Sequence, residues 1–210
     1  MAIQYNIKAQ VVDIRKDSPR KEDAFLVDTN VWFWMTYTRA SHSERPPSQY
    51  QTDLYPNYTN ESLAIGAKIF QSELSFAELT HLIEKAEYEI YSKANPEKFD
   101  NHQIFNKRFR HEFDTERENV VKQVESSWAQ VISMSTQIRS VIDSINAMRR
   151  FRTEKVDGYD LFILESMKNN SVVQIITDDG DYATVPGIQV YTANKNVIKL
   201  AKDQGKLFTR

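Results

Sequence analysis

Two apolar runs in this chain end in acidic residues. Ala24–Val27 is followed directly by Asp28, and Val172–Thr177 is followed by the turn Asp178–Asp181. Short apolar runs of this kind are typical of strands buried on both faces of a parallel sheet. In open α/β sheets, ligand sites form outside the carboxyl ends of the strands, so both groups of acids are expected at one edge.

Two further acids lie near the start of expected helices. Glu78 follows Ser75 by three residues, and Asp160 follows Asp157 by three residues. Ser75 with Glu78 also matches a capping box, and Asp160 also suits the first turn of a helix capped by Asp157. Asp28 itself suits a helix N-cap. A structural role and a chemical role therefore remain open for each acid.

Taken together, these acids indicate a cation site. Carboxylates that are packed together repel one another unless they are protonated or bridged by a cation. Mg²⁺ and Mn²⁺ prefer oxygen ligands and are the expected counter-charge.

The spacing of apolar residues predicts an α/β chain. Strands are expected at Tyr5–Ile14, Ala24–Val27, Val172–Thr177 and Ile188–Tyr191. Helices are expected at Asn30–Thr38, Glu61–Phe70, Leu74–Tyr91, Asp160–Lys168 and Asn194–Lys202. Arg39–Asn60 is expected to be a loop, because it contains three prolines and shows no clear period.

The segment Phe113–Met148 allows two interpretations. Its apolar residues keep a spacing near 3.5, which favours one long helix. The stretch around Ser133 is poor in helix formers, and Ser135 suits the start of a new helix.

Composition sets limits on the class of protein. The chain has 210 residues, 40% of them hydrophobic, with no cysteine and a formal net charge of −2. The absence of cysteine excludes disulfides and thiolate zinc sites. No apolar run reaches the roughly 18 residues of a membrane span. We therefore expect a soluble, cytoplasmic protein with no membrane partner. The chain lacks the excess of basic residues that is typical of proteins that coat DNA or RNA, so any contact with nucleic acid is expected to involve a few local basic residues.

Four short motifs resemble those of PIN-domain ribonucleases. Ala24–Asn30 is similar to the opening motif, and Ser75–Leu79 is similar to the motif that carries the glutamate. Tyr159–Leu164 is similar to the third motif, and Ile176–Tyr182 is similar to the fourth, in which paired aspartates precede an aromatic residue. Their order and their strand or helix context agree with the family.

The length of the chain suggests a single domain over residues 1–210, and the resemblance to the PIN family spans roughly Ala24–Lys202. The implied fold would be a PIN-like three-layer α/β/α arrangement with a central, mostly parallel sheet and an added N-terminal strand within residues 1–23. Residues 39–60 would be a loop insertion and residues 92–130 a helical insertion. The family also carries a short strand before the helix that leads to the third aspartate, which implies a strand at Val131–Met134.

The resemblance also implies residue roles and an activity. Asp28, Glu78, Asp160 and Asp179 match the metal-binding, catalytic acids of the family, and Asp181 matches a secondary acid that binds metal directly or through water. Thr177 and Asn30 would support them. The implied function is a Mg²⁺- or Mn²⁺-dependent endoribonuclease acting on RNA, with DNA not excluded. A toxin with an antitoxin-like protein inhibitor, and a homo-oligomer, are further implications.

Two other functions compete with this one. A non-catalytic PIN-like module that binds nucleic acid or serves as a scaffold would usually lack one or more of the acids, and this chain keeps them all. A phosphatase of another α/β family would require an Asp-x-Asp pattern after the first buried strand, where Thr29 and Asn30 stand instead.

Residues for substrate contact are also expected. Arg149, Arg150 and Arg152 precede the Asp160 helix and suit phosphate contacts, although a solvated helix end explains them equally well. Tyrosines near the Arg39–Asn60 loop suit stacking on unpaired bases, and we consider Tyr37, Tyr50, Tyr55 and Tyr58 for that role. His81, one turn after Glu78, is expected to be a surface or packing residue.

Overall fold

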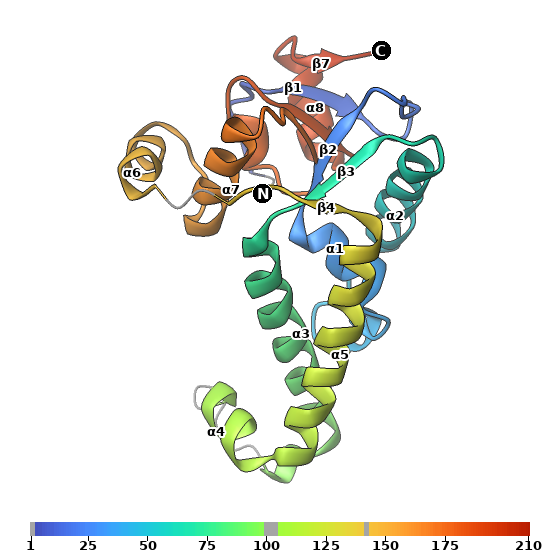
Figure 1. Ribbon diagram of the computed structural model, residues 1–210, viewed down its shortest axis with the longest axis vertical. Coiled ribbons are helices and arrows are strands. Elements are labelled where there is room, and N and C mark those ends of the chain that lie inside the picture. The colour runs from blue at the N-terminus through green and yellow to red at the C-terminus, as the bar shows by residue number, and fades with distance from the viewer. Residues whose placement is uncertain (1–2, 99–104, 141–142) are drawn as a thin grey trace.

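Seven short strands form one sheet in which every described pair is parallel (Figure 1). The computed structural model describes residues 3–98, 105–140 and 143–210. The strand order is β4-β3-β2-β5-β6-β1-β7. The strands are β1 Gln10–Asp13, β2 Ala24–Val27, β3 Lys68–Gln71, β4 Thr136–Gln137, β5 Gln174–Ile176, β6 Gln189–Thr192 and β7 Leu207–Phe208. The expected N-terminal strand is thus present as β1, between β6 and β7.

Helices cover both faces of this sheet. They are α1 Thr29–Thr36, α2 Gln49–Ala64, α3 Glu73–Ala94, α4 Phe105–Glu112, α5 Asp114–Met134, α6 Ser144–Thr153, α7 Gly158–Asn169 and α8 Lys195–Asp203, with short 3-10 turns at Ala40–His42, Pro96–Lys98 and Tyr182–Thr184. Among the described residues, no helix is both long and apolar enough to cross a bilayer.

The alternation of side chains along β2 shows why there are three layers. Phe25 and Val27 belong to the core formed with α1, α2, α3 and α5, whereas Leu26 belongs to the core formed with α7 on the other face. Successive strand residues point to opposite faces, so a continuous apolar run requires cover on both. A third, smaller core joins β1 to α8. The expected three-layer α/β/α fold is confirmed.

A helical arm extends from one end of the sheet (Figure 1). The long helices α3 and α5 lie side by side, and α4 packs on both near their far end. Glu84 of α3 is buried there and accepts hydrogen bonds from Arg110 of α4 and from Arg117 of α5. Helix α4 and most of α5 fall within residues 92–130, the range of the expected helical insertion.

Two expectations about the segment between α1 and β3 are wrong. The expected loop at Arg39–Asn60 contains most of α2, which begins at Gln49 after a capping box formed by Ser48 and Gln51. The expected helix at Glu61–Phe70 ends instead at Ala64, where Gly66 adopts a left-handed φ of 83°, and β3 follows. Pro56 lies inside α2, so burial of neighbouring aromatic residues outweighs the hydrogen bond that proline removes.

The break near Ser133 exists, but the expected strand at Val131–Met134 is wrong. Helix α5 continues to Met134, because Val131 is fully buried in the core on that face of the sheet. Ser135 is extended, and β4 follows at Thr136–Gln137, paired with β3.

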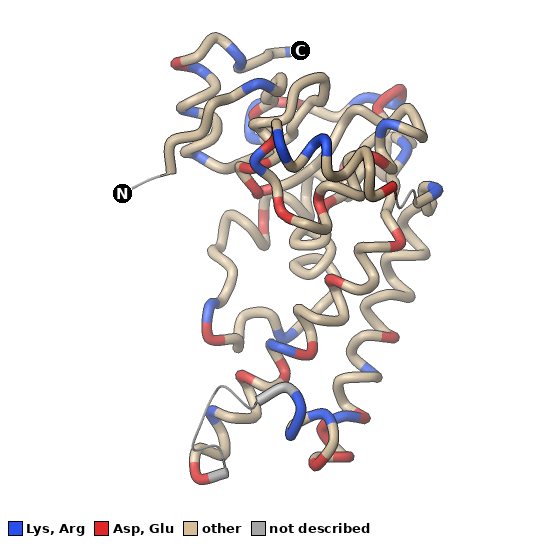
Figure 2. The backbone as a smooth tube through the Cα atoms, turned by 90° about the vertical axis from the view of Figure 1, so that its left-hand side faces the viewer, with Lys and Arg blue, Asp and Glu red and all other residues tan. Residues whose placement is uncertain are grey.

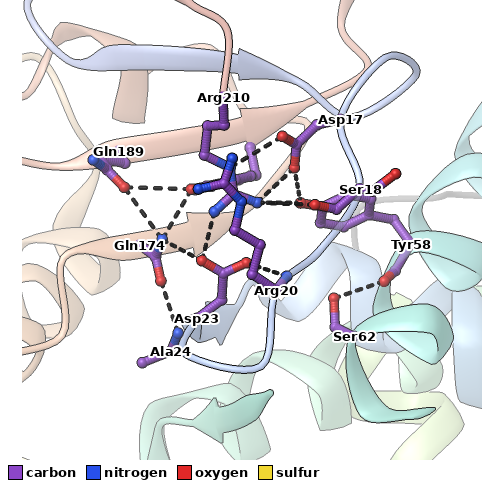
Figure 3. A network of polar contacts seen from close by, with 11 residues as sticks. Asp17, Ser18, Arg20, Asp23, Ala24, Tyr58, Ser62, Gln174, Gln189 and Arg210 are labelled. Atoms are coloured by element: carbon purple, nitrogen blue, oxygen red, sulfur yellow. Dashed lines mark hydrogen bonds and ion pairs between the residues drawn. The ribbon is translucent and has the colours of Figure 1, made fainter. Parts of the chain in front are cut away.

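Arg210 binds the connection between β1 and β2 through hydrogen bonds and ion pairs (Figure 3). Its guanidinium donates to Asp17 Oδ2 at 2.6 Å and to Asp23 Oδ1 at 2.5 Å, and it lies 4.9 Å from the ring centroid of Tyr191. Gln174, at the start of β5, also donates to Asp23. The network therefore ties residues 17–23 to the sheet without a helix in between.

Candidate active site

Strands β2 and β5 are neighbours, and they bring two acidic segments together. Val27 is paired with Ile176, so Asp28 and Thr177 leave the sheet side by side at its carboxyl edge. The Asp28 N–H donates to the Ile176 carbonyl at 3.1 Å, which extends the pairing by one residue.

Asp28 accepts two hydrogen bonds, and one of them gives it the helix-capping role that its sequence context allowed. Its Oδ1 accepts from the Thr29 N–H at 2.7 Å, which caps α1. Its Oδ2 accepts from the Thr177 hydroxyl at 2.7 Å, which fixes the carboxylate across the strand pair. Asp28 is only 7% exposed, so this carboxylate is held in a buried position.

Glu78 is free of the capping role that its spacing from Ser75 suggested. Helix α3 begins at Glu73 with Ser72 as its N-cap, so Glu78 lies in the second turn. Its Oε2 accepts from the Thr29 hydroxyl at 2.5 Å. This contact joins α3 to the first turn of α1 beside Asp28.

Asp160 comes from the first turn of α7, which Asp157 caps. The hydroxyl of Tyr182 donates to Asp160 Oδ1 at 2.6 Å, and Tyr182 is itself buried. The resemblance identified an aromatic residue at this position, but its contact with Asp160 could not be read from sequence spacing.

The acidic turn, residues Asp178–Asp181, is shaped by its own side chains. The Asp179 N–H donates to the Thr177 hydroxyl at 2.9 Å, and the Asp181 N–H donates to Asp179 Oδ1 at 2.8 Å. Thr177 thus contacts both strand-end acids, as its expected supporting role requires.

Asp178 faces α2 and is held by three side chains from it. The hydroxyl of Tyr55 donates to Asp178 Oδ1 at 2.5 Å, and Tyr50 and Gln51 donate to Oδ2 at 2.9 and 2.7 Å. Tyr55 is fully buried. Helix α2, which the sequence did not predict, therefore positions the acidic turn.

The acids from four separate segments line one cavity of about 390 Å³, which we name the acid pocket. Its lining residues are Asp28, Thr29, Asn30, Ala77, Glu78, His81, Leu82, Asp157, Tyr159, Asp160 and Asp179. The structure brings Asp28, Glu78, Asp160 and Asp179 to this one cavity, and strand polarity predicts that result for Asp28 and Asp179. Asp157 was missed, because it was interpreted only as a helix cap, and Asp181 lines a different cavity. The described lining of the acid pocket contains no lysine or arginine.

Burial and mutual repulsion raise the pKa values of these acids. Burial raises the pKa of Asp160 to about 8, and the charges of Asp28, Asp157 and Asp179 add to the effect. Burial also raises the pKa of Asp28 to about 7, with contributions from Asp179 and Glu78. The pKa values of Glu78, Asp179 and Asp181 are raised as well, with burial as the largest cause.

The chemistry of the donor set suits a hard divalent cation. The acid pocket offers carboxylate oxygens, and none of its described lining residues is a lysine or arginine that could relieve their repulsion. As they stand, no three His, Cys, Asp or Glu side chains of the described residues form a group that could hold a metal ion. Each carboxylate is instead turned toward its own hydrogen-bond donor, so binding would require side-chain rotation.

Arg149 and Arg150, which were considered for phosphate contacts because they precede the Asp160 helix, do not line the acid pocket. Both line a larger cavity of about 620 Å³ together with residues that immediately precede β5 and β6, at the amino edge of the sheet. Arg150 pairs there with Glu154 at 2.9 Å and with Glu165. Arg152 is exposed near the end of α6.

The tyrosines considered for base stacking are packed inside the protein. Tyr37, Tyr55 and Tyr58 are at most 3% exposed, and their hydroxyls donate to Glu87, Asp178 and Asp17 respectively. Tyr50 is half-buried and donates to Asp178. These rings therefore serve the core and the positioning of acids.

Comparison with protein-family models, with curated proteins and with solved structures finds no match to this chain.

Proposed function

We propose that this chain is a metal-dependent phosphodiester hydrolase, a PIN-type endoribonuclease that cuts RNA. The observation that carries the proposal is the convergence of Asp28, Glu78, Asp160 and Asp179 on one pocket at the carboxyl edge of a parallel sheet. The resemblance of the four motifs to PIN-domain ribonucleases supports the same assignment.

Asp28, Glu78, Asp160 and Asp179 would hold Mg²⁺ or Mn²⁺ in this proposal, and Asp181 would contribute from the far side of the acidic turn. When bound, such a cation lowers the pKa of a water molecule and stabilises the charge that develops on the phosphate.

The hydroxyl groups around the acids have a positioning role. Thr177 donates to Asp28, Thr29 donates to Glu78 and Tyr182 donates to Asp160. A hydrogen bond from a neutral donor favours the ionised carboxylate, which is the form that binds a cation.

The proposal is tested by cleavage of an RNA panel and a matched single-stranded DNA panel, with Mn²⁺ and with EDTA. The parent should cut RNA with Mn²⁺ only, and Asp160→Asn should abolish cutting. Asp53→Asn, which removes an exposed acid from α2, is the matched control and should cut like the parent.

A contaminating nuclease would cut equally in the Asp160→Asn preparation, and that result would refute the assignment. Binding of RNA by the parent with no cutting of any substrate would instead favour the non-catalytic module.

A further inference from the structure

A second cavity, of about 280 Å³, lies on the other side of the acidic turn. It is formed by the segment before β1, by the connection between α6 and α7, and by residues after β5. Its lining residues are Ile3, Gln4, Tyr5, Asn6, Lys8, Thr153, Lys155, Asp181 and Thr184. We name it the lysine pocket.

The lysine pocket adjoins the acid pocket through two short stretches of chain. Asp181 lines the lysine pocket, and Asp179, two residues earlier, lines the acid pocket. In the same way, Lys155 lines the lysine pocket, and Asp157, two residues later, lines the acid pocket. A ligand that occupies one pocket therefore ends close to the other.

Tyr5 marks the contact between the N-terminal segment and the acidic turn. Its ring lies directly against Gly180, where an added Cβ would be 2.4 Å from the Tyr5 Cζ. Its phenol is also close enough to Asp181 and Asp179 that their charges, in addition to burial, raise its pKa. The N-terminal segment thus lies directly beside the acidic turn.

The two pockets differ in charge. The described lining of the acid pocket has no lysine or arginine, whereas Lys8 and Lys155 line the lysine pocket together with one acid, Asp181. Both lysines are exposed, and no ion pair joins either of them to another residue in the described part of the chain. Lys and Arg are otherwise spread over the fold and interspersed with Asp and Glu (Figure 2).

The geometry points to the lysine pocket as a phosphate-binding subsite for a polynucleotide strand whose neighbouring phosphodiester lies in the acid pocket. The inference rests on the proposed function. Lys8 and Lys155 neutralise a backbone phosphate there, and the side-chain amide of Asn6 offers a neutral hydrogen-bond donor. The subsite supplies the positive charge that the acid pocket lacks, so it holds the strand whether or not a cation is bound.

The test uses binding without cleavage. The full-length parent and the Lys8→Gln/Lys155→Gln variant are titrated in EDTA with a labelled single-stranded RNA and with DNA of the same sequence, over a range of salt concentrations. Loss of two phosphate contacts should make the plot of log binding constant against log salt concentration less steep by about 1.4. Binding should weaken roughly tenfold near ~0.1 M salt. Both nucleic acids should show the change, because the contacts are to backbone phosphate.

Lys21→Gln/Lys68→Gln is the matched control. It removes the same charge from two exposed lysines at the amino edge of the sheet, Lys21 shortly before β2 and Lys68 at the start of β3, and it should bind like the parent. Melting curves of both variants should match the parent, since all four lysines are exposed.

The outcomes separate the subsite from the nuclease. If Lys8→Gln/Lys155→Gln binds with the parent's slope and affinity, or if the parent binds neither nucleic acid, the subsite is wrong even if the parent cuts RNA with Mn²⁺. If Lys8→Gln/Lys155→Gln shows a less steep salt dependence than the parent and the control does not, the subsite is supported. If the parent also cuts no substrate, the proposed hydrolase activity is wrong while the subsite is kept. Equal losses in both double variants would show a nonspecific effect of net charge and would overturn the subsite.

Discussion

Asp28→Asn should stabilise the metal-free protein at pH 8. The Asp28 carboxylate is 7% exposed and accepts from the Thr29 N–H and the Thr177 hydroxyl. An asparagine of the same shape can accept the first hydrogen bond with its oxygen and donate to the Thr177 oxygen with its amide. The substitution therefore removes a buried charge while it keeps the packing and both contacts.

The size of the effect follows from the pKa of Asp28. Burial, with the charges of Asp179 and Glu78, raises this pKa from 3.8 to about 7. Between these values the folded state binds more protons than the unfolded state, so stability falls as pH rises through this window and the penalty is complete above it. A shift of about three units corresponds to at most about 4 kcal/mol, of which roughly 2–3 kcal/mol develops between pH 5 and pH 8.

Urea unfolding in EDTA at pH 5 and pH 8 measures this difference. Asp28→Asn should be the more stable protein at pH 8, by up to about 4 kcal/mol, and its advantage should shrink by roughly 2–3 kcal/mol at pH 5. Asp53→Asn removes an exposed carboxylate and should show no such pH-dependent gap. A parent that is as stable as Asp28→Asn at pH 8, or a gap that is the same at both pH values, would refute the reasoning.

Three further predictions concern hydrogen bonds and ion pairs near the acids and in the rest of the fold. Tyr182→Phe removes the donor that lowers the pKa of Asp160, so the pH at which Mn²⁺ begins to raise the melting temperature should shift upward. Tyr55→Phe should cost about 1–2 kcal/mol in urea unfolding and also weaken Mn²⁺ binding, because the acidic turn loses a buried donor. Tyr58→Phe, whose hydroxyl donates elsewhere on the fold, should cost stability alone, and equal Mn²⁺ affinities in the two tyrosine variants would contradict the positioning role of α2. Arg210→Ala should destabilise the fold by about 3–5 kcal/mol in urea unfolding, because the buried carboxylates of Asp17 and Asp23 lose their charge partner. The affinity for Mn²⁺ should stay unchanged.

The convergence of Asp28 and Asp179 could be predicted because it depends only on the identity and direction of two strands. The runs before Asp28 and Asp179 are apolar on both faces, which identifies buried parallel strands and fixes the edge at which they end. Strand polarity then places both acids together, whatever the lengths of the segments in between.

Helix α2 and strand β3 could not be predicted in the same way. The buried face of α2 consists largely of tyrosines such as Tyr55 and Tyr58, which resemble loop residues when they are counted beside prolines. Strand β3 has only Ile69 and Phe70 as apolar residues, too few to separate a strand from the end of a helix. Contacts with the rest of the fold, rather than the local sequence pattern, determine that these segments form a helix and a strand.

The positions of Arg149 and Arg150 show a different limit. Their closeness in sequence to the Asp160 helix suggested closeness to the acids. Helix α6 packs against α7 so that these arginines face the amino edge, where Glu165 and Glu154 pair with Arg150. Sequence distance gives no direction in space, whereas strand polarity does.

Direct measurement of Mn²⁺ binding tests the central claim most closely. Electron paramagnetic resonance of free Mn²⁺ is recorded during titration into the parent, Asp160→Asn and Asp53→Asn at pH 8. The parent and Asp53→Asn should remove the free-ion signal saturably, and Asp160→Asn should leave most of the ion free. A parent that leaves Mn²⁺ free, or an Asp160→Asn variant that binds it as tightly as the parent, would contradict a cation site in the acid pocket.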